Sequence, residues 1–92
     1  MELENQIKIL KWSEFRTVHE AGQLYIVIDQ LELSEVATKA VENDHSYINN
    51  CLQNGLIAPP TKEEIRYFNT NENMNFNSIK VEPYLFVQRI RN

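Results

Sequence analysis

The five residues Leu24-Tyr25-Ile26-Val27-Ile28 form the longest unbroken apolar run of the 92-residue sequence. Every position is apolar and three are β-branched, so the run predicts a β-strand that is buried on both faces. A membrane helix needs about 20 apolar residues, so we expect no membrane span. A chain of this length has room for one hydrophobic core. We therefore expect one domain over residues 1–92, with a small sheet packed against helices.

Two helices are predicted before this strand. Leu3, Ile7 and Leu10 recur at the spacing of one helical face, which predicts a helix near residues 2–10. Ser13 is a good N-cap for a second helix, which would end just before Gly22.

Three helices are predicted after the strand. Ser34 would cap a helix over 35–43, and Asp44 would cap one that ends at Gly55. Their apolar stripes are Val36, Ala37, Ala40 and Val41, and then Tyr47, Ile48, Cys51 and Leu52. The third begins at a capping box, Thr61 with Glu64.

Residues 69–77 contain five asparagines and predict a surface loop. Two strands follow it, over 76–82 and 84–87, and Pro83 between them favours the edge of a sheet. The expected order is ααβαααββ, and the fold class is α+β.

The segment after Pro83 is the candidate interaction surface. It is apolar on both faces, yet an edge position in so short a chain leaves it uncovered, so a second copy would cover it. The candidate interaction residues are Pro83, Tyr84, Leu85, Phe86, Val87 and Gln88. The first hypothesis is a non-catalytic protein-interaction module whose partner is itself, as a homodimer, or another protein.

The net charge of −4 argues against a partner bound mainly through phosphates, such as nucleic acid. Charge is uneven, because Lys80, Arg89 and Arg91 give residues 73–92 a net charge of +2. This basic end either keeps the strand soluble or meets an acidic partner. One cysteine cannot form an internal disulfide, and the start of the sequence is acidic, so we expect a cytoplasmic protein.

No catalytic constellation is predicted. His45 and Cys51 diverge by about 120° around their helix, and His19 has no positioned partner. The acidic turn over 29–35, with Asp29, Glu32 and Glu35, carries oxygen ligands of the kind hard cations prefer, but helix capping and solvation are the simpler explanation of these acids. We expect no cofactor and no metal. A small enzyme or ligand pocket that uses this turn or Tyr84 stays open as an alternative.

Residues 34–57 support another alternative, a helix-turn-helix that binds nucleic acid. The two short helices followed by Gly55-Leu56-Ile57 resemble the helix-turn-helix of winged regulators related to mercury-resistance repressors. The second helix offers four side chains that could read bases but no lysine or arginine to anchor phosphates. These side chains are His45, Asn49, Asn50 and Gln53.

Several motifs in order resemble one family of small bacterial proteins, domain of unknown function 2288, over residues 12–88. The segments that carry the resemblance are Trp12-Ser13-Glu14-Phe15, Val27-Ile28-Asp29, Leu31-Glu32-Leu33, Pro60-Thr61 with Glu63-Glu64, and Val81 to Gln88. Cys51 stands where many relatives carry Trp, which argues against a family-wide catalytic thiol. The resemblance implies no catalytic residues.

Overall fold

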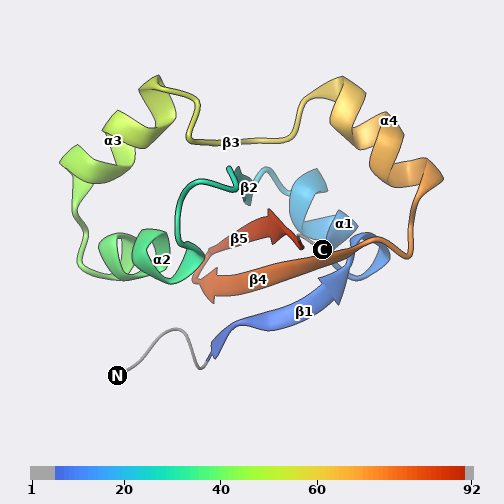
Figure 1. Ribbon diagram of the computed structural model, residues 1–92, viewed down its shortest axis with the longest axis horizontal. Helices are drawn as coiled ribbons and strands as arrows, with labels where there is room; N and C mark the ends of the chain where they lie inside the picture. The colour runs from blue at the N-terminus through green and yellow to red at the C-terminus, as the bar shows by residue number, and fades with distance from the viewer. Residues whose placement is uncertain (1–5, 91–92) are drawn as a thin grey trace.

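Five strands form one mixed sheet in the order β1-β4-β5-β2-β3 in the computed structural model, which describes residues 6–90 (Figure 1). The strands are β1 (Lys8–Lys11), β2 (Leu24–Val27), β3 (Ile57–Ala58), β4 (Asn75–Val81) and β5 (Tyr84–Arg89). Neighbours are antiparallel except for β2 and β5, which are parallel. The sheet therefore brings the two most apolar segments of the chain together at its centre.

Four helices cover this sheet, two on each face. They are α1 (Trp12–Glu20), α2 (Leu33–Val41), α3 (His45–Gln53) and α4 (Lys62–Thr70). The expected α+β class is confirmed, and from residue 12 onward the expected helices and strands occur in the expected order. Ile57 and Ala58 pair with β2 as a short edge strand, which was not among the expected strands.

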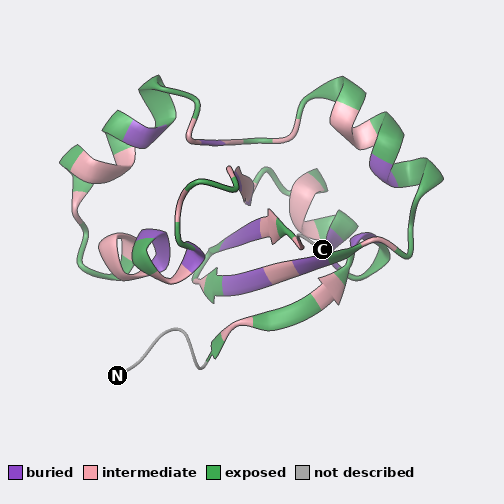
Figure 2. Cartoon of the chain, in the orientation of Figure 1, coloured by how far each residue is buried: buried purple, intermediate pink, exposed green. Residues whose placement is uncertain are grey.

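Alternate residues of β5 lie on opposite faces of the sheet and pack into two separate hydrophobic cores. Phe86 packs with α2 and α3 on one face, while Leu85 and Val87 pack with α1 and α4 on the other. The first core comprises Val27, Leu33, Val36, Ala37, Cys51, Ile57, Ile79 and Phe86, and the second comprises Trp12, Phe15, Leu24, Phe68, Phe76, Leu85 and Val87. Figure 2 shows the buried positions along β4 and β5. A central strand with two covered faces explains why Leu85, Phe86 and Val87 of β5 are all apolar.

Residues 1–5 of the helix expected near 2–10 lie outside the described part of the chain. For the remaining residues of that segment the expected helix is wrong. Lys8–Lys11 form β1 and pair with β4 from Asn75 to Ser78. Ile7 and Leu10 pack into different cores, on opposite faces of the sheet. Their helical spacing was therefore misleading, because pairing with a strand some 70 residues away outweighs local periodicity.

Ser13 is not an N-cap, because α1 begins directly after β1 with Lys11 at the cap position. Backbone from the loop after α4 satisfies the first amides instead. Trp12 N donates to Met74 O at 3.2 Å, and Ser13 N donates to Glu72 O at 3.4 Å. These carbonyls replace a side-chain cap. At the other end, Gly22 has a φ of 74° and ends the helix as expected.

Of the other three expected N-caps, two are confirmed and one is wrong. Asp44 accepts a hydrogen bond from Tyr47 N at 3.1 Å, and Thr61 forms the expected capping box with Glu64. Ser34, in contrast, lies inside α2, whose N-cap is Glu32. Leu33 is buried, and its packing against the core starts the helix earlier than the Ser34 cap predicts.

The edge position expected for residues 84–87 is wrong. β5 lies between β4 and β2, while Pro83 lies with Glu82 in the two-residue turn that follows β4. Proline in this turn removes no hydrogen bond from the ladder. The apolar strand is therefore covered by its own chain, and the original reason for expecting a second copy no longer holds.

Candidate functional site

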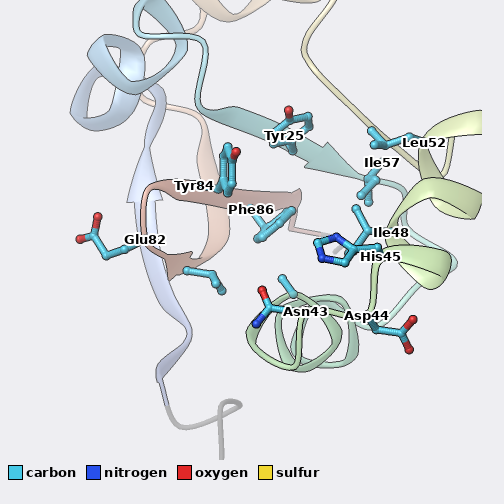
Figure 3. Close-up of a pocket in the computed structure, with 12 residues that line it drawn as sticks. Tyr25, Asn43, Asp44, His45, Ile48, Leu52, Ile57, Glu82, Tyr84 and Phe86 are labelled. Carbon is cyan, nitrogen blue, oxygen red and sulfur yellow. The ribbon is translucent and has the colours of Figure 1, made fainter.

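A groove of about 310 Å³ lies between the α2–α3 pair and one face of the sheet (Figure 3). Strands form its floor, and α3 forms one wall. The apolar and aromatic side chains that line it include Tyr25, Ile48, Leu52, Ile57, Tyr84 and Phe86. A concave surface of this size and composition is typical of binding sites.

Three aromatic rings form one continuous part of the groove. The ring centroids of Tyr25 and Tyr84 are 5.7 Å apart with an interplanar angle of 70°, and those of Tyr25 and Phe86 are 6.0 Å apart at 31°. Rings at these separations are in direct contact and hold one another in place. Phe86 is anchored in the core with 3% of its surface exposed, whereas Tyr84 keeps 42%.

Polar side chains surround the groove without converging on a point inside it. Asp44 caps α3 and lies 3.8 Å from Lys39 Nζ, while Glu82 lies 2.8 Å from Lys80 Nζ. Figure 3 shows the Asp44 and Glu82 carboxylates directed away from the groove and the His45 ring directed toward it. His45 therefore has no carboxylate positioned to share a proton with it.

The six candidate interaction residues are divided by the structure. Leu85, Phe86 and Val87 are buried core, while Pro83 and Tyr84 are exposed. Gln88 is fixed internally, since its side-chain amide donates to Ile28 O and to Leu31 O at 2.7 Å each. Of this set, Tyr84 is the exposed residue that also lines the groove.

The acidic turn over 29–35 does not take part in the groove. Asp29, Glu32 and Glu35 are exposed and absent from its lining, so the structure does not bring them together with Tyr84. Within residues 6–90, no group of three His, Cys, Asp or Glu side chains is arranged to hold a metal ion.

The thiol and imidazole candidates lie apart. Cys51 is buried in the core, whereas His45 is exposed at the groove. Burial, then the neighbouring Cys51, raises the pKa of Tyr47 to about 12. His19 packs against Trp12, with ring centroids 6.1 Å apart. Burial gives Cys51 a packing role, and the ring contact positions His19 beside Trp12.

The helix pair over 34–57 forms as expected, with Glu42, Asn43 and Asp44 as its connection. Asn43, with a φ of 58°, takes the left-handed position at which glycine is common. The polar side chains of α3 expected to read bases are all exposed. No cation of α3 accompanies them, and Lys39 on α2 is engaged with Asp44.

Sequence reasoning missed the groove because its lining comes from six separate helices and strands. Tyr25 was assigned to a fully buried strand, and Leu52 to an apolar helical stripe. The available signal was a tyrosine in each of the two apolar strands, since a phenol ring suits a half-exposed site better than a fully buried one.

Within the described residues, none of the helices is long and apolar enough to cross a membrane. The fold is similar to a solved structure, the NMR solution structure of PA1075 from Pseudomonas aeruginosa, with a TM-score of 0.84 and 20% sequence identity over 99% of this chain and 83% of that one. No curated protein matches the sequence. The family model described as protein of unknown function, DUF2288, matches residues 1–89. Since that match spans nearly the whole sequence, the chain belongs to the DUF2288 family.

Proposed function

We propose that this chain is a non-catalytic protein-interaction module that forms a homodimer through the groove and its two apolar borders, which are the sides of the groove that carry Leu52 and Tyr84. The observation that carries the proposal is the exposure of Leu52 and Tyr84, at 40% and 42%. Figure 3 shows the two side chains on opposite sides of the groove. Large apolar side chains beside a concave apolar floor are the arrangement found at the centre of protein interfaces.

The rigidity of Tyr84 supports its role as an anchor. Its ring packs edge-on against Tyr25, which in turn packs against the buried Phe86. An anchor already held in position loses little conformational freedom on binding. Tyrosine is also among the residues that contribute most to interface energy.

The charges around the groove favour a second copy as the partner. Each of the nearby carboxylates, Asp44 and Glu82, is paired with a lysine of the same chain. The borders are therefore locally close to neutral, although the whole chain carries a net charge of −4. Two identical borders can meet without the repulsion that unpaired carboxylates would cause.

The groove also suits a two-fold arrangement. In an isologous dimer the same patch serves both copies, and with the two-fold axis along the groove the Leu52 side of one copy faces the Tyr84 side of the other. Each copy then supplies a protruding side chain and a concave floor. Neither groove carboxylate, Asp44 or Glu82, is directed toward His45, which supports a binding role over a catalytic one.

The test is the solution mass by light scattering on a sizing column, over a concentration series that reaches tens of micromolar. We expect a dimer mass for the unmodified chain and a monomer mass for Leu52→Asp and Tyr84→Asp, because each places a charge in the proposed interface. Tyr67→Asp is the matched control, since Tyr67 is 50% exposed on α4 and does not line the groove.

A monomer mass for the unmodified chain throughout the series would overturn the homodimer. A dimer that persists in both groove variants, or one that Tyr67→Asp disrupts equally, would overturn the placement of the interface. Circular dichroism of each variant checks that the mass refers to folded protein.

A further inference from the structure

A second concavity, of about 370 Å³, lies between α1 and α4 and is separate from the groove. Its lining is His19 from the last turn of α1, Pro60 before α4, and Lys62, Ile65, Arg66 and Asn69. No carboxylate lines it, in a chain that has 13 acidic and 9 basic residues. The local excess of cationic groups is therefore opposite to the charge of the whole molecule.

The two cationic side chains of α4 lie on one side of the helix. Lys62 and Arg66 are four residues apart, which places them one above the other. The carboxylate of Glu64 is occupied elsewhere, since its Oε1 accepts a hydrogen bond from Thr61 N at 2.9 Å. Glu63 lies about 100° around the helix from Lys62 and is not among the residues that line the concavity.

Neither of these cations has an ion-pair partner among residues 6–90. The ion pairs there engage Arg16 with Glu72, Lys39 with Asp44 and Lys80 with Glu82. Arg89 lies over the Tyr67 ring, 5.7 Å from its centroid. Half of the lysines and arginines in the described part of the chain have an ion-pair or cation–π partner, and Lys62 and Arg66 belong, with Lys8 and Lys11, to the other half.

Asn69 adds a hydrogen-bond donor, and a contact with the core fixes the orientation of its side-chain amide. Its Oδ1 accepts a hydrogen bond from the indole nitrogen of the fully buried Trp12 at 2.9 Å. This contact assigns the amide oxygen to Trp12 and leaves the amide NH₂ to donate elsewhere. Within residues 6–90 that NH₂ makes no hydrogen bond, and Asn69 lines the concavity.

We propose that this concavity binds a small phosphate monoester. Lys62, Arg66 and the Asn69 amide supply donors, and the three terminal oxygens of a phosphate monoester accept from several directions at once. His19, as a further ring donor, completes the set. Pro60 and Ile65 provide an apolar side against which the organic part of the ligand packs.

The experiment is a titration of the ¹⁵N-labelled full chain with phenyl phosphate, followed by the backbone amide signals at constant ionic strength. We expect saturable shifts centred on residues 62–69 and on His19, with weaker saturable shifts from inorganic phosphate. The double variant Lys62→Gln and Arg66→Gln should bind phenyl phosphate at least about tenfold more weakly, because it loses two charge-assisted hydrogen bonds.

The matched control is the double variant Lys8→Gln and Lys11→Gln, which removes the same charge from the exposed strand β1. It should bind phenyl phosphate as the unmodified chain does. No saturable shift with either phosphate would overturn the proposal, and so would equal weakening of binding in both double variants. A parallel titration with a glutamate-rich peptide gives the third such result, if the peptide shifts these amide signals and phenyl phosphate does not. None of these results depends on whether the chain forms a dimer through the groove.

Discussion

The indole nitrogen of Trp12 donates to the side-chain oxygen of Asn69 at 2.9 Å, joining the first residue of α1 to the last turn of α4. The two residues are 57 positions apart in the sequence. Trp12 is fully buried, so this bond satisfies a polar group that water cannot reach. It also fixes the relative position of the two helices that border the proposed phosphate site.

The first prediction concerns this bond. Asn69→Ala leaves the indole N–H buried without a partner, so we expect the free energy of unfolding to fall by about 1–3 kcal/mol. Urea denaturation followed by the fluorescence of Trp12, the one tryptophan of the sequence, measures the change.

Asn69→Asp is the informative companion, since it keeps an acceptor for the indole and should be less destabilising than Asn69→Ala. Asn73→Ala is the control, because Asn73 is exposed in the loop after α4. Equal stability of Asn69→Ala and Asn73→Ala would contradict the structural role of the bond.

The second prediction separates the core residues of β5 from the exposed one. Phe86→Ala removes a ring that is 3% exposed, and we expect a loss of about 3–5 kcal/mol, which is a large part of the stability of a small domain. Tyr84→Ala removes a ring that is 42% exposed and should cost considerably less. Thermal unfolding of both variants gives the comparison, and similar losses would contradict the arrangement of the two rings.

Much of the fold follows from local features of the sequence. The capping box at Thr61, the Asp44 cap and the stop at Gly22 are short-range interactions whose partners lie within a few residues, so spacing alone predicts them. The two apolar strands are likewise readable, because burial on both faces requires apolar residues at every position.

The parts that could not be predicted depend on distant partners. The residues of β1 share the spacing of a helix, and pairing with β4 decides their conformation. Pro83 is compatible with an edge strand or with a turn, and the position of β2 beside β5 decides between them. The groove and the concavity at Asn69 need several elements placed in space, which one sequence without its fold does not provide.

The third prediction concerns nucleic acid. The exposed side chains of α3 include asparagine and glutamine, yet α3 has no cation, and Lys39 on the adjacent helix is engaged by Asp44. Without phosphate contacts from this helix pair we expect no gel shift of a random DNA duplex at low salt, even at micromolar protein. A salt-sensitive shift that persists in the double variant Lys62→Gln and Arg66→Gln would contradict this prediction and revive the helix-turn-helix hypothesis.

The fourth prediction concerns stability at high pH. Burial, then the neighbouring Cys51 and Glu35, raises the pKa of Tyr47 from 10.0 to about 12. The folded chain therefore holds the phenol proton more tightly than the unfolded chain does. The resulting stabilisation is complete below pH 10 and is lost as the pH rises toward 12.

Urea denaturation at a series of pH values from 9 to 12 measures this loss, with the range set by the two pKa values of Tyr47. Other groups also titrate there, so the comparison is with Tyr47→Phe, which keeps the ring and removes the ionisable proton. We expect the variant to lose less stability over this range than the unmodified chain, and Tyr67→Phe, an exposed tyrosine on α4, to behave as the unmodified chain does. Parallel pH profiles for Tyr47→Phe and the unmodified chain would show that the phenol of Tyr47 is not stabilised in its protonated form by the fold.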